Sequence, residues 1–159
     1  MASNEHLRVR FGEPARGWLA VSLSGDGREL EFVASAVPAD SLSDLADALL
    51  VAASGAPAAV AWHEEPGAII FGFRMDKGKL AFAAWREPSF SGGRESAGGA
   101  EQTPLFAAQA PPAAILRPFW KALRDLQAAS AQEEHQASWG HRFPERAVAR
   151  LGDWLAGGR

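Results

Sequence analysis

Apolar and polar residues alternate along three segments near the N-terminus, with the period of two that is typical of half-buried β-strands. The apolar positions are Leu7, Val9 and Phe11, then Leu19, Val21 and Leu23, then Leu30, Phe32, Ala34 and Ala36. Gly25-Asp26-Gly27 lies between the last two segments, and glycine reaches the positive φ angles of a tight turn without a Cβ clash. The pattern therefore predicts strands, the last two of them joined as a β-hairpin.

The spacing of apolar residues changes to that of an amphipathic helix between Ser41 and Ser54. One face of this helix carries Leu42, Leu45, Leu49 and Ala52. Ser41, followed three residues later by Asp44, is expected to cap the first turn. Gly55 and Pro57 are expected to end the helix, because glycine favours the C-terminal position and proline cannot continue it.

Alternation then returns in three further segments. Their apolar residues are Val60 and Trp62, then Ile69, Phe71, Phe73 and Met75, then Leu80, Phe82 and Ala84. Glu65-Pro66-Gly67 and Asp76–Lys79 separate these segments and have the composition of turns. Three strands joined by short turns form an antiparallel meander, and Leu105–Gln109 is expected to pair with the same sheet.

Two helices are predicted in the last third of the chain. The apolar stripe of the first is Ile115, Leu116, Phe119, Trp120, Leu123 and Leu126. Pro118 lies inside this stripe, so the regular helix is expected to begin near Arg117, after a turn at Pro111-Pro112. The second helix is expected to begin at Pro144 and to end at Gly157-Gly158.

Residues 88–103 are rich in serine and glycine and poor in apolar residues, which predicts a flexible surface loop. The order of the elements favours a single α+β domain covering residues 1–159. We expect a mainly antiparallel, bent sheet of six or seven strands, with one inserted helix and two C-terminal helices on its apolar side. A chain of 159 residues buries enough surface to fold without a disulfide or a structural metal.

The charge of the chain limits the classes of partner. Residues 1–87 carry 8 basic and 12 acidic side chains, and residues 88–159 carry 8 and 7. Neither half has the basic excess of a nucleic-acid-binding protein, and no apolar run is long enough to span a membrane. The chain contains no cysteine, which excludes disulfides, thiolate nucleophiles and cysteine-based metal sites. Abundant alanine, glycine and arginine, and a first segment without the apolar core of a signal peptide, favour a protein of the bacterial cytosol.

His63-Glu64-Glu65 is the densest polar cluster, and it is either a metal or acid–base site or a solvated hairpin tip. Metal sites need three or more converging ligands at suitable spacing, which favours the hairpin tip. His135 and His141 join His63 as ligands only if the fold brings all three together. No cofactor is expected, because the sequence has no phosphate-binding loop and no complete dinucleotide fingerprint.

Two charged pairs occupy the first and third predicted strands. Arg8 and Arg10 share one face of the first strand, and Glu29 and Glu31 share one face of the third. If these strands are neighbours, the charges form ordinary cross-strand ion pairs, which is the favoured interpretation. The alternative is a charged recognition patch.

Part of the chain resembles the WapI-type bacterial immunity proteins. The shared features are Trp18-Leu19 in an early strand, an amphipathic helix at Ser41–Ser54, Glu65-Pro66 before the strand Ile69–Phe73, and a glycine turn at Gly78. The resemblance covers residues 17–86 and does not account for the helical tail. It implies a small cytosolic protein that neutralises a toxin by direct binding, although likeness of fold is an associational argument for function.

Two functions remain open. The first is a non-catalytic binding protein, such as an immunity protein, whose partner is another protein and basic rather than acidic. The second is a small-ligand binder or hydrolase, with a cavity between the sheet and the C-terminal helices. The sequence favours the first, leaves a homo-oligomer open, and identifies no catalytic or metal-binding residue. The expected binding residues are Trp18, Trp62, His63, Glu64, Glu65 and Trp85.

Overall fold

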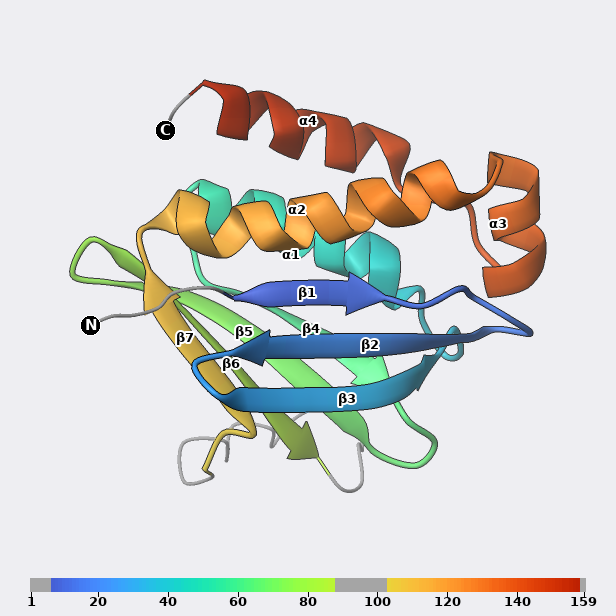
Figure 1. Cartoon of the computed structure of the whole chain (residues 1–159), viewed down its shortest axis with the longest axis horizontal. Helices are drawn as coiled ribbons and strands as arrows, with labels where there is room; N and C mark the ends of the chain where they lie inside the picture. The colour runs from blue at the N-terminus through green and yellow to red at the C-terminus, as the bar shows by residue number, and fades with distance from the viewer. Residues whose placement is uncertain (1–6, 88–102, 158–159) are drawn as a thin grey trace.

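The computed structural model describes residues 7–87 and 103–157 (Figure 1). These residues form seven strands and four helices. The strands are β1 (Arg8–Phe11), β2 (Trp18–Gly25), β3 (Arg28–Ser35), β4 (Ala58–His63), β5 (Ala68–Asp76), β6 (Lys79–Glu87) and β7 (Phe106–Ala110). The helices are α1 (Ser41–Ala53), α2 (Pro112–Ala129), α3 (Gln132–Trp139) and α4 (Glu145–Ala156). The predicted flexible loop at 88–103 lies outside the described residues except for its last position.

The seven strands form one antiparallel sheet in which spatial order follows sequence order, β1 to β7. Asp26-Gly27 and Lys77-Gly78 connect β2 to β3 and β5 to β6, and all four residues have positive φ angles. Two consecutive positive φ angles give the turn whose twist matches a two-residue hairpin. The predictions of an α+β class, of an antiparallel sheet and of a strand near Leu105–Gln109 that pairs with this sheet are confirmed.

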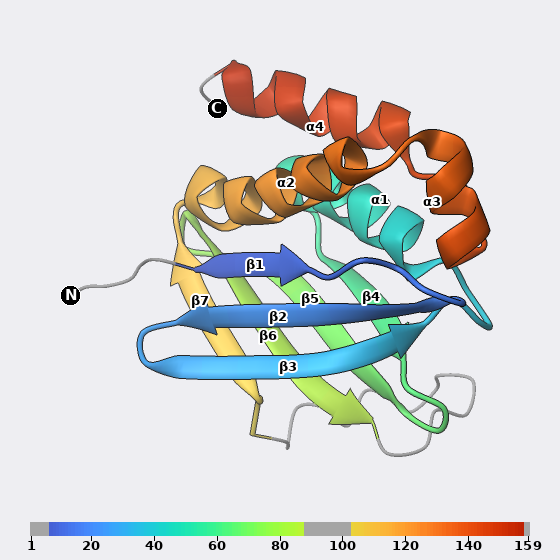
Figure 2. The ribbon, with the colours of Figure 1, turned by 45° about the vertical axis from the view of Figure 1, so that its right-hand side comes forward.

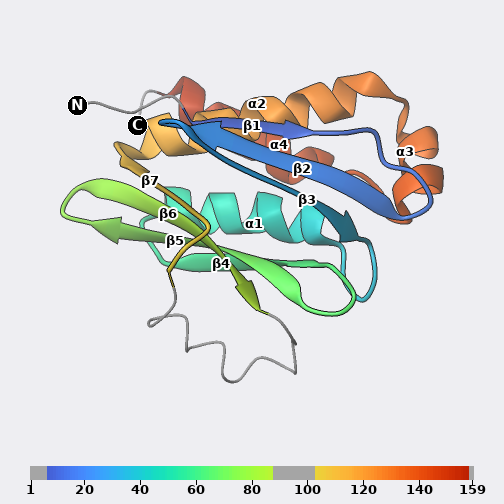
Figure 3. The same cartoon turned by 60° about the horizontal axis from the view of Figure 1, so that its bottom comes forward.

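The sheet bends sharply between β3 and β4. These two strands share one residue pair, Ser35↔His63, whereas β2 and β3 are paired along their whole length. Figure 3 shows the result as two limbs, β1–β3 and β4–β7, with α1 between them. The bend lets the helices α1, α2 and α4 lie together on the concave side (Figure 2).

Helix α1 begins at Ser41, so its N-cap lies one residue earlier than predicted. Asp40 is the N-cap, and its side chain accepts a hydrogen bond from the backbone N–H of Ser43. Ser41 is already helical, and its hydroxyl donates to the carbonyl oxygen of Ala61 in β4 at 2.6 Å. The prediction that Ser41 is the cap is therefore wrong, because the hydroxyl is used to attach α1 to the sheet.

The C-terminal part holds three helices rather than the two expected. α2 begins at Pro112 and continues through Pro118, so the predicted start near Arg117 is wrong. Proline at the first helical position loses no helical hydrogen bond, and the buried stripe of α2 extends on both sides of Pro118. The additional helix, α3, lies in a stretch that the sequence pattern left without an element. Among the described helices, none is both long and apolar enough to cross a membrane.

The core fills the space between the sheet and the helices with aromatic rings. Phe71 on β5 lies at its centre, with ring centroids at 5.1 Å to Phe82, 5.6 Å to Trp62, 6.0 Å to Phe32 and 6.1 Å to Phe119. The core includes Leu49, Phe71, Phe82, Phe119 and Leu123 from the predicted apolar stripes, together with Leu151 of α4, and all six are buried. Helix α2 packs on β1, β6 and β7, and α4 packs on α1 and α2.

Candidate functional site

Four of the six residues predicted to bind a partner gather around Ser35, at the bend of the sheet. Ser35 pairs with Trp18 on one side and with His63 on the other. Its hydroxyl donates a hydrogen bond to Oε2 of Glu65 at 2.8 Å and accepts one from the backbone N–H of Val37 at 3.1 Å. Trp18, His63, Glu64 and Glu65 are thus brought together from three strand ends.

Three exposed apolar side chains surround this point. The exposed fractions are 38% for Trp18, 51% for Val33 and 63% for Val37. Val33 and Val37 lie two residues before and after Ser35, and Val33 pairs with Ala20, two residues beyond Trp18. We call Trp18, Val33 and Val37 the apolar corner. Of the described large apolar side chains, one other, Val51 on α1, is exposed.

The predicted hairpin tip His63-Glu64-Glu65 is only partly solvated. Glu65 is exposed but held by Ser35, and His63 is buried. Glu64 forms a two-pronged contact with the guanidinium of Arg86, with nitrogen–oxygen distances of 3.2 and 3.3 Å. The interpretation of this cluster as a simple exposed tip is therefore wrong, because backbone pairing buries the histidine and β6 supplies a partner for Glu64.

Two of the predicted binding residues lie elsewhere. Trp62 is fully buried and packs on Phe11, Phe32 and Phe71, so it belongs to the core. Trp85 is half-buried on the outer face of β6, where its ring covers Gly72; a Cβ on this glycine would lie 3.1 Å from the indole. The indole nitrogen of Trp85 is buried without a hydrogen-bond partner.

Helix α3 fixes the backbone next to the apolar corner. The N–H of Gly17 donates to the carbonyl oxygen of Ser138, and the carbonyl oxygen of Gly17 accepts from the N–H of Ala36. Trp139 is fully buried, and its indole N–H donates to Oδ1 of Asp40 at 2.9 Å. These contacts hold the segments on both sides of the corner in one arrangement, so a partner would meet an ordered surface.

The histidines do not assemble a metal site. Within the described residues no three or more His, Asp or Glu side chains are placed to hold a metal ion. The His141 Nε2 lies 3.1 Å from the carbonyl oxygen of Ala36. His135 is buried against Phe143 with both ring nitrogens unpartnered, and burial lowers its pKa, opposed by the charge of Asp40.

The charged residues of β1 and β3 lie in rows across the outer face of the sheet. The register aligns Arg8 with Ser24 and Glu29, and Arg10 with Ser22 and Glu31. β2 lies between β1 and β3 and separates their backbones by about 10 Å, and the described residues include no ion pair between these two strands. The favoured interpretation was wrong because it assumed that the two strands are neighbours.

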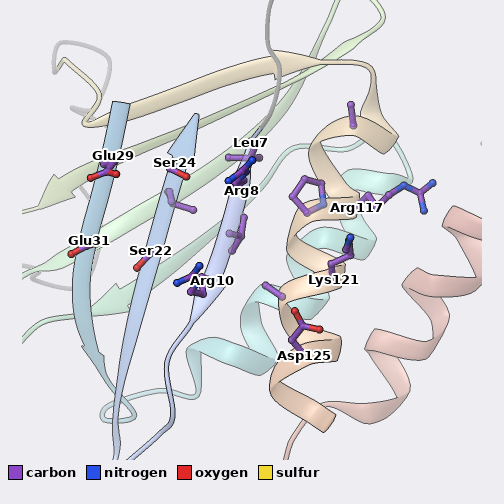
Figure 4. A pocket seen from close by; sticks show the side chains of 15 residues that line it. Leu7, Arg8, Arg10, Ser22, Ser24, Glu29, Glu31, Arg117, Lys121 and Asp125 are labelled. Carbon is purple, nitrogen blue, oxygen red and sulfur yellow. The ribbon is translucent and has the colours of Figure 1, made fainter. Parts of the chain in front are cut away.

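These rows form the floor of a hollow that has a volume of about 630 Å³ and extends to α2. Figure 4 shows the floor on β1–β3 and the side chain of Lys121 on the adjacent helix. We call this hollow the charged groove. The groove is open and polar, whereas the hydrolase alternative expects an apolar cavity between the sheet and the helices. Aromatic rings pack in that space instead, and the ring centroids of Phe82 and Phe119 are 5.2 Å apart.

Comparison of the chain with protein-family models, with curated proteins and with solved structures gives no match.

Proposed function

We propose that this protein is a non-catalytic binding protein whose partner is another protein and whose contact surface is centred on the apolar corner. The observation that carries the proposal is the gathering of Trp18, Val33 and Val37 around Ser35, all three exposed within the described part of the chain. Exposed tryptophan is the residue type most enriched among the side chains that dominate binding energy. A ring with apolar neighbours on both sides offers a large contact area at low entropic cost.

The charges near the corner favour a basic partner. Glu65 lies beside Ser35, and Glu31 lies two residues from Val33 on the same face. Glu64 also adjoins the corner, but its charge is shared with Arg86. Carboxylates at the rim of an apolar contact increase the rate of association with a cationic surface more than they increase affinity.

The hydrogen bonding of Ser35 stabilises the proposed contact surface. Here the hydroxyl of Ser35 donates to the carboxylate of Glu65, and Ser35 is buried. This hydroxyl therefore holds the loop of Glu65 in place and contributes to the shape of the surface.

The test compares Trp18→Ala with Val51→Ala. Both remove an exposed apolar side chain, but Val51 lies on α1, away from the corner. Proteins captured from the native cell extract by the wild-type chain would be purified and titrated against each variant by calorimetry. We expect Trp18→Ala to weaken binding by at least about tenfold, which is about 1.4 kcal/mol, and Val51→Ala to leave it unchanged. Equal binding by Trp18→Ala would refute the proposal.

A finer proposal is that the partner is a toxin that this contact inactivates. It rests on the resemblance of residues 17–86 to the WapI-type immunity proteins. The captured partner would be expressed in cells alone and together with each form of the chain. We expect the wild type and Val51→Ala to rescue growth, and Trp18→Ala to fail to rescue it. A partner without toxicity would refute this finer proposal and leave the proposed binding function.

A further inference from the structure

The charged groove has arginines on β1, carboxylates on β3 and a row of hydroxyls between them, and its α2 side carries both Lys121 and Asp125. Arg8 and Arg10 lie on β1 and Lys121 lies on α2, while the carboxylates of Glu29 and Glu31 lie on β3 (Figure 4). Ser22 and Ser24 of β2 separate the two sides. The groove therefore offers different chemistry at its two edges, about 10 Å apart.

Three cations of this groove form no ion pair within the described part of the chain. Among residues 7–87 and 103–157, Arg8, Arg10 and Lys121 form no ion pair, and all three are exposed. β1 and α2 run in the same direction (Figure 1), and Lys121 lies level with Arg10 (Figure 4). Arg8, Arg10 and Lys121 therefore all line the groove next to β1, where Asp125 also lies one helical turn after Lys121.

This donor set fits a phosphate group. Arginine presents a planar fork of N–H donors that matches phosphate oxygens, and lysine adds a point charge. A phosphate monoester carries about −1.5 to −2 charges at neutral pH. Three cations therefore match a phosphate better than they match the single charge of a carboxylate ligand. The hydroxyls of Ser22 and Ser24, which pair with Arg10 and Arg8 in the register, are further donors.

The opposite edge selects the rest of the ligand. The carboxylates of Glu29 and Glu31 offer hydrogen-bond acceptors, so they favour a group that carries hydroxyls. Their distance of about 10 Å from β1 is also close to the length of a phosphorylated hexose. A volume of about 630 Å³ lies within the usual range for ligand sites.

We propose that the charged groove binds a phosphorylated polyhydroxy compound of the sugar phosphate class. The phosphate lies against Arg8, Arg10 and Lys121, and the hydroxyl groups extend over the serine row to Glu29 and Glu31. This site lies beyond the proposed protein-binding function and does not depend on it.

The first experiment is calorimetric titration of the full chain with glucose 6-phosphate, inorganic phosphate and glucose at low ionic strength. We expect saturable binding of one glucose 6-phosphate molecule per chain, at least about tenfold tighter than that of either of the other two compounds. Inorganic phosphate that binds as tightly as glucose 6-phosphate overturns the role of the carboxylate edge. Absence of saturable binding of glucose 6-phosphate overturns the whole proposal.

The second experiment separates specific contacts from diffuse charge. Arg10→Gln/Lys121→Gln is expected to weaken glucose 6-phosphate binding by at least about tenfold. The matched control Arg74→Gln/Arg150→Gln removes the same charge from two exposed positions outside the groove and is expected to have no more than about a twofold effect. An equal loss in both variants overturns the proposal.

The third experiment tests the carboxylates by the sign of their effect. Glu29→Gln/Glu31→Gln removes two negative charges, so charge alone would tighten the binding of every anion. If the carboxylates accept hydrogen bonds from the sugar, this variant binds glucose 6-phosphate more weakly and inorganic phosphate no more weakly than the wild type does. Tighter binding of both compounds overturns the assignment of the sugar hydroxyls to this edge.

Discussion

Replacing Phe71 by alanine removes the ring at the centre of the core. Phe71 has no exposed surface and lies between the sheet and α2, where it contacts the rings of Phe32, Phe82 and Phe119. The contacts with Phe32 and Phe82 are nearly perpendicular, with interplanar angles of 88° and 89°. These residues come from β3, β6 and α2, so the substitution affects packing between elements that are distant in the sequence.

The expected cost follows from the buried area and from the ring contacts. A buried phenylalanine removes roughly 150 Å² or more from water, and about 25 cal/mol per Å² gives about 4 kcal/mol. Alanine retains about 0.8 kcal/mol of this through its methyl group. Loss of the edge-to-face contacts adds about 1 kcal/mol. We therefore expect Phe71→Ala to lower the free energy of unfolding by about 4 kcal/mol, within the range for large core truncations.

Urea unfolding followed by far-ultraviolet circular dichroism measures this loss. The matched control is Val33→Ala, a truncation on the neighbouring limb of the sheet at an exposed position, with an expected cost under about 1 kcal/mol. Both variants must retain the wild-type denaturant slope for the comparison to report stability. A loss under about 1 kcal/mol for Phe71→Ala would show that this face of β5 does not face the core.

The remaining predictions concern the helices. The folded state favours neutral His135, since burial lowers its pKa, whereas the unfolded value is near 6.5. The stability contributed by neutral His135 is present above pH 6.5 and is lost as the pH falls below 6.5. When the pH is lowered from 7.5 to 5.5, the free energy of unfolding should therefore drop more for the wild type than for His135→Phe. Gly152→Ala places a Cβ 2.9 Å from Nε1 of Trp120, which donates a hydrogen bond to the carbonyl oxygen of Val148. The melting temperature should therefore fall, although alanine favours helices over glycine. A rise in the melting temperature would contradict the packing of α4 on α2.

The sequence predicted the strands and turns because each follows from local rules. Alternation alone places Trp18 and Val33 on the outer face, and the same rule places Trp62 with Val60 on the core side. The assignment of Trp62 to a binding surface therefore overlooked a signal that the sequence contains. Asp40 and Ser41 are both good capping residues, so their order could not be decided without Ala61, the acceptor of the Ser41 hydroxyl.

Other features depend on contacts between distant parts of the chain. α3 buries only His135 and Trp139, so it has no apolar stripe for a sequence pattern to reveal. Its position depends on Trp139 reaching Asp40, 99 residues away in the sequence. The charged groove likewise joins Arg10 to Lys121, and neither residue type nor local spacing indicates that these two side chains share a surface.

The apolar corner and the charged groove lie on the same outer face of β1–β3, yet Trp18→Ala and Arg10→Gln/Lys121→Gln act on them separately. Trp18 and Ser22, which pairs with Arg10, are four residues apart on β2, which corresponds to about 14 Å along the strand. This distance exceeds the Debye length near physiological salt, so removing the charges of Arg10 and Lys121 has little electrostatic effect at Trp18. Loss of partner binding in Trp18→Ala with retained sugar phosphate binding therefore reports on the corner alone. The reverse pattern in Arg10→Gln/Lys121→Gln reports on the groove, and neither result depends on the other proposal.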